Sequence, residues 1–321
     1  MKNTPHPIQY QGSKRNLASA ILHYLPKDID CLIEPFAGSA AISIAAAERQ
    51  LAKNYWINDL NKPLSDLLQM IVESPADIAE FYKKVWNEQH DEDSLEHYYK
   101  IRESFNRKKD PRLFLYLLAR CVKGSVRYNS EGLFNQSPDK RRHGTRPETM
   151  RANILGASAL LKGKVRFSAN DYKMVLAQAQ QNDFIYMDPP YQGVCGDRDC
   201  RYLSGINHHD FIAALEELNS KRIRYIVSYD GRRGDKTFGE TLPDFLNLTC
   251  IELDAGRSSQ ATLLGRDEVT YESLYLSPGL MKNSSGKPME SYRHSHIKQL
   301  NLKTNDAAAI FGPGTVAPVA A

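Results

Sequence analysis

The segment from Phe184 to Tyr191 carries the residue types best suited to chemistry, because an apolar strand stops there at Asp188-Pro189-Pro190-Tyr191. Proline locks φ and has no N–H, so this turn is rigid and its carbonyl oxygens are free to accept hydrogen bonds. A conjugated amine, such as that of adenine, is a weak nucleophile. Accepting its two hydrogens on the Asp188 carboxylate and the Pro189 carbonyl would favour the more nucleophilic tetrahedral form, while Tyr191 stacks on the base. The same residues are also compatible with a plain turn at the end of a buried strand.

A second loop has the features of a nucleotide site. Gly38-Ser39-Ala40 follows an apolar strand and opens a helix, so its backbone can approach a ligand closely. Asp59 lies 21 residues after Gly38, at the end of the next strand, where a carboxylate suits the hydroxyls of a ribose. The loop lacks the full glycine pattern of dinucleotide sites and is also compatible with an ordinary tight turn. The two loops together favour a nucleotide-binding enzyme more strongly than either does alone.

Alternating strand and helix patterns surround both loops. We expect the first half of a nucleotide-binding α/β unit, with a helix over 16–25, a strand over 30–36, a helix over 41–50 and a strand over 55–59. From about 62 to 161 the pattern is helical, including 64–73, 75–87 and 110–121, with a basic loop region around 127–151. Strands return at 165–168, 183–187 and 224–228, and in a hairpin of 251–254 with 272–276. Beyond 277 the chain is rich in Ser, Gly, Pro and Ala, which predicts a disordered tail.

In five segments the chain resembles the Dam-type (D12 class) adenine-specific DNA methyltransferases, over roughly residues 8–278. In chain order the segments are Tyr10–Lys14, Glu34–Ala40, Arg127–Asn135, Asp188–Tyr191 and Glu272–Tyr275. This order is the family's own: cofactor loop first, target-recognition insert next, catalytic loop last. The resemblance implies an α/β fold, with a Rossmann-like S-adenosylmethionine-dependent methyltransferase sheet and an inserted, mainly helical target-recognition domain. The expected catalytic domain covers 1–61 and 162–279, the inserted domain 62–161 and the disordered tail 280–321.

The resemblance also implies a role for each motif residue. S-adenosylmethionine is the expected cofactor, with Tyr10 and Lys14 near it and Asp59 on its ribose hydroxyls. The residues expected around the methionine part of the cofactor are Glu34, Pro35, Phe36, Gly38 and Ser39, and those around its adenine are Asp171 and Tyr172. Asp188 is expected to contact both cofactor and substrate. The residues expected around the amine to be methylated are Pro189, Pro190 and Tyr191. Taken alone, Lys14 would be a solvated lysine, Tyr10 a packing residue and Asp171 the N-cap of a helix over 173–180. Ala40 stands where many relatives have a second glycine.

Basic residues are concentrated in the predicted insert, which favours a partner with phosphates, although a solvated charged face is the alternative. The expected DNA-contacting residues are Lys123, Arg127, Tyr128, Asn129, Phe134, Asn135, Arg141 and Arg142. Arg127 is the candidate for a guanine contact, since a guanidinium can bond both major-groove acceptors of guanine. Because a duplex hides the adenine amine in base pairing, the target nucleotide must be flipped out. These residues do not specify the target sequence.

Composition sets wider bounds. Hydrophobic residues make up 41% of the 321 residues, the mean hydropathy is -0.51 and the net charge of +4 is mild, which fits a folded soluble protein. No run approaches the ~20 apolar residues of a membrane span and the N-terminus has no signal-peptide core, so we expect a cytoplasmic protein. The resemblance implies a bacterial or phage-encoded enzyme, and we expect it to be a monomer. The five cysteines lack zinc-ligand spacing, so no metal is expected. Cys195 and Cys200 lie in a segment over 192–207 that is either a flap over the flipped base or a solvated loop.

The predicted function is methyl transfer from S-adenosylmethionine to the exocyclic N6 amine of a flipped-out adenine in double-stranded DNA. Such an enzyme would serve a restriction-modification system or act as a solitary or phage methylase. One alternative is an RNA adenine or a protein amide as substrate, because related Pro-Pro-Tyr loops serve planar amines generally; the basic insert argues against protein. The other alternative is a catalytically silent DNA-binding relative, against which the intact Asp188 and cofactor loop argue.

Overall fold

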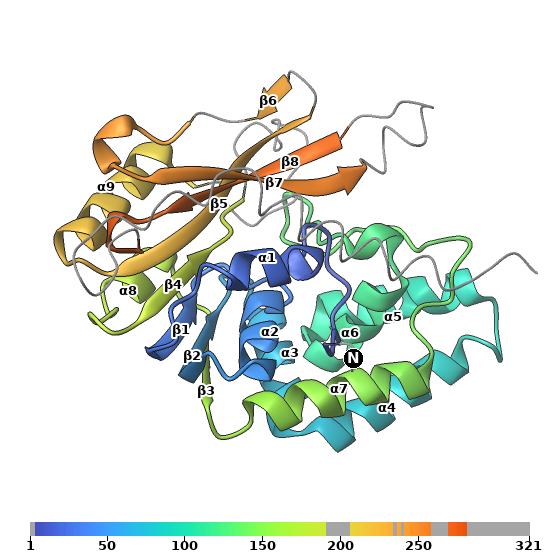
Figure 1. Cartoon of the computed structure of the whole chain (residues 1–321). Helices are drawn as coiled ribbons and strands as arrows, with labels where there is room; N and C mark the ends of the chain where they lie inside the picture. The colour runs from blue at the N-terminus through green and yellow to red at the C-terminus, as the bar shows by residue number, and fades with distance from the viewer. Residues whose placement is uncertain (1–3, 191–205, 234–235, 239–240, 258–268, 281–321) are drawn as a thin grey trace, which may run out of the picture. The chain divides into compact units, whose positions relative to one another are not determined.

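The computed structural model describes residues 4–190, 206–233, 236–238, 241–257 and 269–280. All of them belong to one compact unit, Met1–Leu280. At its centre lies a sheet in the order β3-β2-β1-β4-β5-β8-β7, with β6 paired to β5 (Figure 1). Neighbours from β3 to β5 run parallel, whereas β6 and β8 run antiparallel to β5, and β7 antiparallel to β8. The strands are β1 (Ile29–Glu34), β2 (Ala52–Asn58), β3 (Val165–Ser168), β4 (Phe184–Met187), β5 (Arg224–Arg233), β6 (Lys236–Phe238), β7 (Thr249–Arg257) and β8 (Val269–Leu276).

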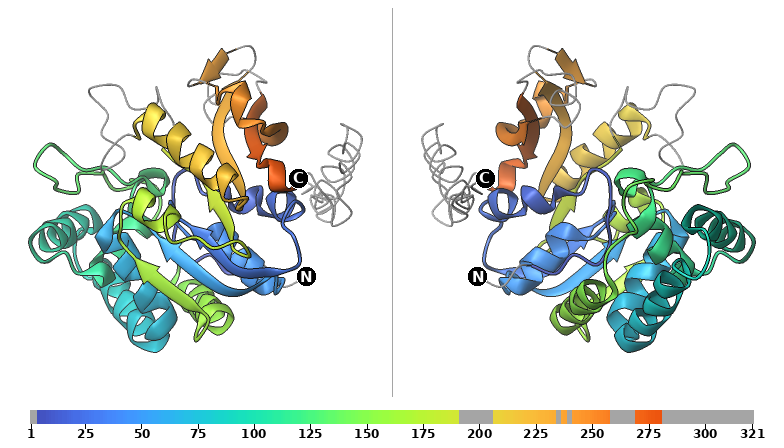
Figure 2. Two further views of the ribbon diagram at one scale, coloured as in Figure 1. Left: turned by 90° about the vertical axis from the view of Figure 1, so that its left-hand side faces the viewer. Right: turned by 90° about the vertical axis from the view of Figure 1, so that its right-hand side faces the viewer.

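Helices cover both faces of the sheet and fill the long connection between β2 and β3. The first group comprises α1 (Ala18–Leu22), α2 (Ala41–Glu48), α8 (Tyr172–Leu176) and α9 (His208–Ser220). The helices between β2 and β3 are α3 (Lys62–Glu73), α4 (Pro75–Glu88), α5 (Ser94–Lys108), α6 (Pro111–Arg120) and α7 (Pro147–Leu161). Figures 1 and 2 show that these last five helices gather in one group beside the part of the sheet that holds β2 and β3.

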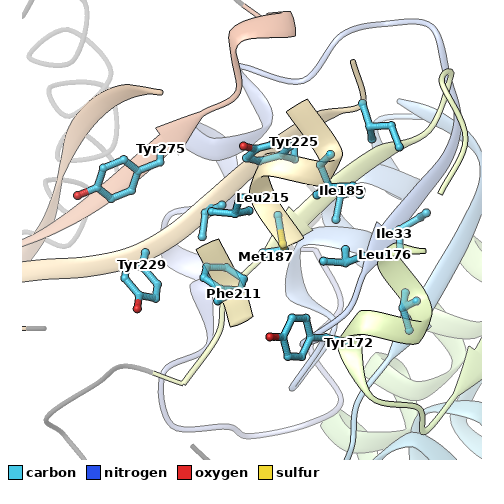
Figure 3. Close-up of a cluster of buried hydrophobic side chains, with 14 of the residues drawn as sticks. Ile33, Tyr172, Leu176, Ile185, Met187, Phe211, Leu215, Tyr225, Tyr229 and Tyr275 are labelled. Carbon is cyan, nitrogen blue, oxygen red and sulfur yellow. The ribbon is translucent and has the colours of Figure 1, made fainter. Parts of the chain in front are cut away.

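Side-chain alternation along the strands explains the two helical layers. Because successive residues of a strand point to opposite faces, Ile33, Ile185 and Val227 lie on the same face, and they pack there against α8 and α9 (Figure 3). Their neighbours, such as Leu32 and Phe184, face the side that α1 and α2 cover, and these side chains are fully buried. Parallel strands buried on both faces are typical of a doubly wound α/β fold, so the predicted fold class is confirmed.

Three local predictions differ from the structure. The helix expected over 173–180 is the shorter α8, Tyr172–Leu176. The helix expected over 16–25 is a 3₁₀ turn, Lys14–Asn16, followed after Leu17 by the short helix α1. The basic loop region expected around 127–151 ends earlier, because α7 begins at Pro147. Proline is favoured at the first position of a helix, since its fixed φ suits the helix and its missing N–H has no partner there anyway.

Two predictions about whole segments fall largely outside the described residues. These are the disorder of the tail from 281 onward and the role of the segment that contains Cys195 and Cys200. Within the part of the chain that the structure does describe, no helix has the length and apolar character needed to cross a membrane.

Candidate active site

A cavity of about 290 Å³ lies at the carboxyl ends of β1 and β4, where the strand order of the sheet reverses. Open α/β sheets bind ligands at such a point. The expected site residues that line the cavity are Tyr10, Lys14, Glu34, Pro35, Phe36, Gly38, Ser39, Asp59, Asp171, Tyr172, Asp188, Pro189 and Pro190. Tyr191, the remaining residue expected at the catalytic turn, lies outside the described residues. The fold thus brings residues as far apart in sequence as Tyr10 and Pro190 to one cavity.

Lys14, Asp188 and Glu272 form a group of two carboxyl groups around one ammonium group, which we name the Asp188 cluster. Lys14 Nζ lies 2.8 Å from Asp188 Oδ1, 2.9 Å from Asp188 Oδ2 and 3.0 Å from Glu272 Oε1. Lys14 is 7% exposed and Asp188 21%, and both line the cavity. The cluster depends on the sheet, because β5 pairs with β4 on one side and with the strand of Glu272, β8, on the other. An ionisable carboxyl group therefore borders the cavity beside a buried cation.

Burial and mutual charge set the protonation of this cluster. Burial raises the pKa of Asp188 to about 6, a rise that Lys14 opposes and Glu272 increases. Burial alone would lower the pKa of Lys14, but the charges of Asp188 and Glu272 outweigh it and hold that pKa above its usual range. At pH values above about 6, Asp188 is therefore ionised and accepts hydrogen bonds without donating any, while Lys14 stays protonated.

Glu34 ends β1 and supports the start of α2. Its Oε2 accepts a hydrogen bond from the backbone N–H of Ser43 at 2.9 Å, and the residue is 2% exposed. Burial raises the pKa of Glu34 to about 7, although the hydrogen bonds from Ser43 oppose this rise. Glu34 thus fixes the helix on one wall of the cavity in addition to lining it.

Asp59 joins the loop after β2 to the loop after β1. Its Oδ2 accepts a hydrogen bond from the N–H of Gly38 and its Oδ1 one from the N–H of Asn61, both at 2.9 Å. Burial raises the pKa of Asp59, and these two hydrogen bonds oppose the rise. A carboxylate has about four acceptor positions, so both oxygens can accept further hydrogen bonds from the hydroxyls of a ligand.

The turn between β1 and α2 is held tightly against the N-terminal segment. Gly38 has a φ of +50°, and a Cβ at this position would lie 3.0 Å from Cε1 of Tyr10, so both conformation and space require glycine. The hydroxyl of Ser39 lies 2.8 Å from that of Ser13. Ala40 also has a positive φ, of 53°, which is uncommon for a residue other than glycine. The backbone of this turn is therefore fixed close to the cavity.

The far wall of the cavity comes from the start of α8. Asp171 caps this helix, since its Oδ1 accepts a hydrogen bond from the N–H of Lys173 at 2.8 Å. Tyr172 is buried and its ring lies 5.2 Å from that of Phe36. Its hydroxyl is buried without a hydrogen-bond partner among the described residues, and burial raises its pKa to about 12. A buried polar atom of this kind, on a cavity wall, is suited to a ligand.

Residues 127–136 form a short hairpin beside the cavity, which we name the 127–136 hairpin. The N–H of Asn135 bonds to the carbonyl of Arg127 at 3.0 Å, and the N–H of Asn129 to that of Leu133 at 2.9 Å. Tyr128 lines the cavity, and its hydroxyl donates to Oδ1 of Asn61 at 3.1 Å. The hairpin is thereby tied to the same loop that holds Asp59.

The expected DNA-contacting side chains fall into three groups by exposure. Lys123, Asn135, Arg141 and Arg142 are exposed, Arg127 and Asn129 are half-buried, and Tyr128 and Phe134 are buried. Phe134 packs against the rings of Phe105 and Phe114, at centroid distances of 6.0 and 5.6 Å. Stacking or wedging by Tyr128 and Phe134 would first require them to leave these positions, because tertiary packing turns both rings inward.

Motif reasoning missed several residues that complete the site. Asn61 accepts a hydrogen bond from the hydroxyl of Tyr128. It lies two residues after Asp59 and directly before α3, at the N-cap position, where asparagine is common. Glu272 was expected only as part of the last strand, and its contact with Lys14 depends on strand pairing that no local pattern reveals. Within the described ranges, no group of three His, Cys, Asp or Glu side chains is placed to hold a metal ion.

Comparison with known proteins agrees with this geometry. A family model described as D12 class N6 adenine-specific DNA methyltransferase matches residues 10–253. The chain is 29% identical over 245 residues to a DNA N-6-adenine-methyltransferase of Escherichia phage P1, a match that covers 71% of this chain and 28% of that protein. It is 28% identical to the type II methyltransferase M.MjaIII of Methanocaldococcus jannaschii, covering 58% of this chain and 68% of the relative. It is also 28% identical to a DNA adenine methylase of Serratia marcescens, covering 60% and 68% respectively.

Proposed function

Because the chain belongs to the D12 class N6 adenine-specific DNA methyltransferases, we propose that it transfers a methyl group from S-adenosylmethionine to the N6 amine of adenine in double-stranded DNA. The observation that carries this proposal is the position of Asp188-Pro189-Pro190. This turn borders the same cavity as the Gly38 turn and Asp59. The proposed acceptor for an amine and the proposed binding site for a nucleoside would therefore lie side by side.

The cavity fits the cofactor. S-adenosylmethionine, when bound, supplies a methyl group activated by its sulfonium. Asp59 would accept hydrogen bonds from the ribose hydroxyls. The hydroxyl of Tyr172, which has no hydrogen-bond partner among the described residues, would bond to the adenine part. Phe36 provides apolar surface beside Tyr172. The volume of about 290 Å³ is at the lower end of the range for small-molecule sites, as expected of a cavity that encloses its ligand closely.

Asp188 acts on the amine of the substrate. In its ionised form it accepts a hydrogen bond from one N–H of the amine, while the Pro189 carbonyl accepts from the other. Both bonds favour a tetrahedral nitrogen whose lone pair is available for attack. Lys14 keeps Asp188 ionised despite its burial, and Glu272 holds Lys14 in place from the other side. Methyl transfer would form the N–C bond, break the C–S bond of the sulfonium and leave S-adenosylhomocysteine. The methylated amine is more acidic, and Asp188 would accept the proton that it loses.

The helical segment over 62–161, with α3–α7 and the 127–136 hairpin, is proposed as the target-recognition domain. Arg127 would contact a guanine, and the exposed Lys123, Asn135, Arg141 and Arg142 would contact the DNA around it. Tyr128 and Phe134 are proposed to act by holding the hairpin rather than by touching bases. The adenine is proposed to be flipped out of the duplex to reach Asp188. The enzyme would do this in the cytoplasm, where cellular DNA is accessible.

The test is transfer of a tritiated methyl group from S-adenosylmethionine to unmethylated plasmid DNA, followed by nucleoside analysis. The proposal expects all label in N6-methyl-2′-deoxyadenosine. Label in a methylated cytosine, in RNA offered as competitor or in the protein itself would overturn it. Mapping the modified adenines on the same plasmid then gives the target sequence, and Arg127→Ala should reduce discrimination between this sequence and its single-base variants.

A further inference from the structure

The 127–136 hairpin is held through its main chain by one face of α5. Tyr98, Arg102 and Asn106 lie four residues apart on this helix, and Lys109 follows directly after its end. Side chains at spacings of three and four residues share one face of a helix. All four of these side chains donate hydrogen bonds to backbone carbonyls of the hairpin. We name these four residues the α5 stripe.

The contacts run along the stripe in register with the hairpin. The hydroxyl of Tyr98 donates to the carbonyl of Gln136 at 2.8 Å, and Arg102 Nη1 lies 3.3 Å from the carbonyl of Asn135 and 3.4 Å from that of Gln136. Further along α5, Lys109 Nζ lies 3.2 Å from the carbonyl of Gly132. Successive turns of the helix therefore hold successive residues of the hairpin, in the opposite chain direction.

Asn106 makes the most specific of these contacts. Its Nδ2 donates to the carbonyl of Phe134 at 3.0 Å, and its Oδ1 accepts from the N–H of the same residue at 2.8 Å. An asparagine amide can satisfy both backbone groups of one residue only in a single orientation, so Asn106 fixes the hairpin in position and in rotation. The ring of Phe134, buried against Phe105 and Phe114, fixes the same residue from its other side.

The side chains that remain outside this clamp are those that could read DNA. Asn135, between the two clamped residues Phe134 and Gln136, is exposed. Asn129 uses its Oδ1 to accept from the N–H groups of Glu131 and Leu133, so its oxygen is committed to the turn itself. The amide of Asn135 therefore projects from a backbone that is fixed on both sides, which makes it a well-placed reader of a base edge.

We propose that the α5 stripe, and Asn106 above all, determines target specificity by positioning Asn135 and the rest of the 127–136 hairpin through their main chain. This inference rests on the proposed function and deepens it. The stripe needs no contact with DNA to do so. A reader that is ordered before binding loses less conformational freedom when it docks, and it presents one geometry to every sequence that it meets. A loosened hairpin would adapt to wrong sequences as well as to the right one.

The experiment compares the wild type with Asn106→Ala and with a matched control, Asn87→Ala, which makes the same change at an exposed position of α4. Three quantities are measured: hydrogen exchange of the Phe134 amide, Kd for S-adenosylhomocysteine, and the ratio of methylation rates at the mapped target and at its best single-base variant. For Asn106→Ala we expect faster exchange, an affinity within about twofold of wild type and a discrimination ratio at least about tenfold lower, the scale of one displaced bidentate base contact. Asn87→Ala should change none of them.

A double variant separates positioning from general loosening. If Asn106 acts in part by positioning Asn135, then Asn135→Ala should lose discrimination by itself, and adding Asn106→Ala to it should lower discrimination by a smaller factor than Asn106→Ala does in the wild type. Fully additive losses would contradict the proposal, as would unchanged discrimination in Asn106→Ala despite faster exchange. Should Asn106→Ala fail to fold, Lys109→Met, at an exposed position, removes the Gly132 hydrogen bond and the cation–π contact with Phe105, and should give the same changes in smaller size. A wild type that methylates no DNA would sink the proposed function, whereas unchanged exchange at Phe134 in Asn106→Ala would sink the clamp by itself.

Discussion

Two buried polar clusters of the molecule contain a fully or nearly buried cation, yet they are built for opposite purposes. In the Asp188 cluster, Lys14 lies between two carboxyl groups and one of these, Asp188, borders the cavity. In the second, which we name the Arg120 cluster, the guanidinium of Arg120 meets the backbone carbonyl of Asp139, Oε1 of Gln89 at 3.3 Å and the hydroxyl of Ser94 at 3.4 Å. None of these four residues lines the cavity.

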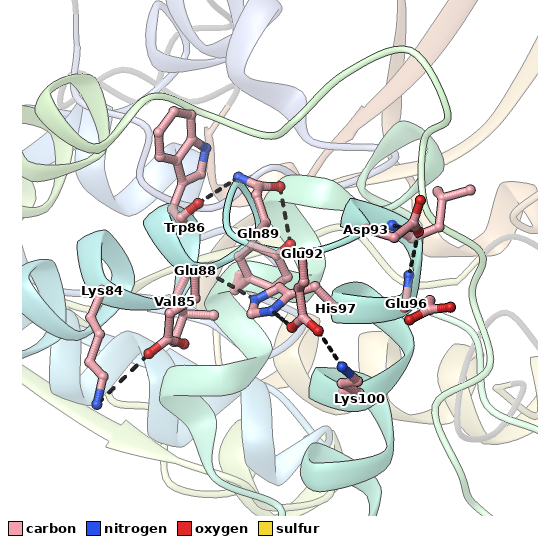
Figure 4. Close-up of polar contacts among 12 residues, drawn as sticks. Lys84, Val85, Trp86, Glu88, Gln89, Glu92, Asp93, Glu96, His97 and Lys100 are labelled. Carbon is pink, nitrogen blue, oxygen red and sulfur yellow. Dashed lines mark hydrogen bonds and ion pairs between the residues drawn. The ribbon is translucent and has the colours of Figure 1, made fainter.

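The hydrogen bonds of Gln89 show that the Arg120 cluster holds neighbouring elements of the fold together. Its Nε2 donates to the carbonyl of Trp86, as Figure 4 shows, and to that of His143. Its Oε1 accepts from Tyr116 and Arg120. These contacts join α4 and α6 to the loop that carries the exposed basic residues. The Arg120 cluster shows that a buried charge by itself does not mark a functional site. A carboxyl group that borders a cavity, and whose pKa is raised by burial and further by a second carboxyl group, is a better indication of one.

Among the variants that leave Asp188 itself in place, the largest effect is expected from Lys14→Met, which removes the cation of the Asp188 cluster. Asp188 and Glu272 would then face each other without compensation, so the pKa of Asp188 should rise further and its ionised fraction at pH 7 should fall. We expect methyl transfer to slow by about 10²-fold, the lower end of the range for proton-transfer groups, with partial recovery at higher pH. Lys53→Met, at an exposed lysine that pairs with Asp30, is the control. A normal rate for Lys14→Met at pH 7 would remove Lys14 from the mechanism.

The matching change in the Arg120 cluster should affect stability instead. Arg120→Met leaves the carbonyl of Asp139 and Oε1 of Gln89 short of a donor, which costs about 3 kcal/mol in the free energy of unfolding. Urea unfolding measures this loss, and the single-turnover rate of the folded fraction should stay within about threefold of wild type, since Arg120 lies away from the cavity. If Arg120→Met kept the stability of the wild type but lost methyl transfer, the Arg120 cluster would act in catalysis and the contrast with the Asp188 cluster would be wrong.

The sheet and the two loops were predictable because their signals are local. Apolar runs that end at Asp59 and at Asp188-Pro189 predict both the strands and the expected site residues at their ends. The family match confirms the resemblance to the D12 class. Helix α5 gives a weaker signal. Its sequence is mostly polar, with His97, Tyr98 and Phe105 as its buried residues, and it depends on the cap by Asp93 and on packing against α6.

The parts that could not be predicted depend on contacts between distant segments. Lys14 and Asp188 are 174 residues apart in sequence and meet only because the N-terminal turn lies over the end of β4. Phe134 stands in a polar segment beside Asn135, as a base-stacking residue would, and only the packing of α5 and α6 reveals that it is buried. Local sequence reports residue types and element ends, whereas burial and pairing between elements follow from the assembled fold.

The pH dependence of catalysis should show which carboxyl group at the cavity, Asp188 or Glu34, controls the rate by its ionisation. Because the pKa of Asp188 is raised to about 6 and the ionised form is the active one, the rate should be constant above that pH and fall about tenfold per unit below it. Glu34, with a pKa raised to about 7, is the competing candidate. In Glu34→Gln, whose amide oxygen still accepts from Ser43, the break near 6 should persist. Its disappearance in this variant would assign the titration to Glu34.

The smallest effect concerns the hydroxyl of Tyr172, which is buried without a partner among the described residues. Tyr172→Phe removes a polar atom that is costly in the ligand-free protein, so thermal unfolding should occur at the same temperature or higher. If the cofactor satisfies this hydroxyl, Kd for S-adenosylhomocysteine should rise about fivefold, the value of one hydrogen bond of about 1 kcal/mol. Calorimetric titration measures this change, and unaltered affinity would show that the ligand does not use Tyr172.

The central claim is that Asp188 acts at the cavity on an adenine amine, and single-turnover methyl transfer by Asp188→Asn tests it most directly. This change keeps the shape of the side chain and removes its charge. With saturating S-adenosylmethionine and unmethylated DNA, the rate of N6-methyladenine formation should fall by about 10²- to 10⁴-fold, while S-adenosylhomocysteine binds within about threefold of wild type. Asp66→Asn, at an exposed aspartate of α3, should be unaffected. Transfer by Asp188→Asn at the wild-type rate would contradict the account.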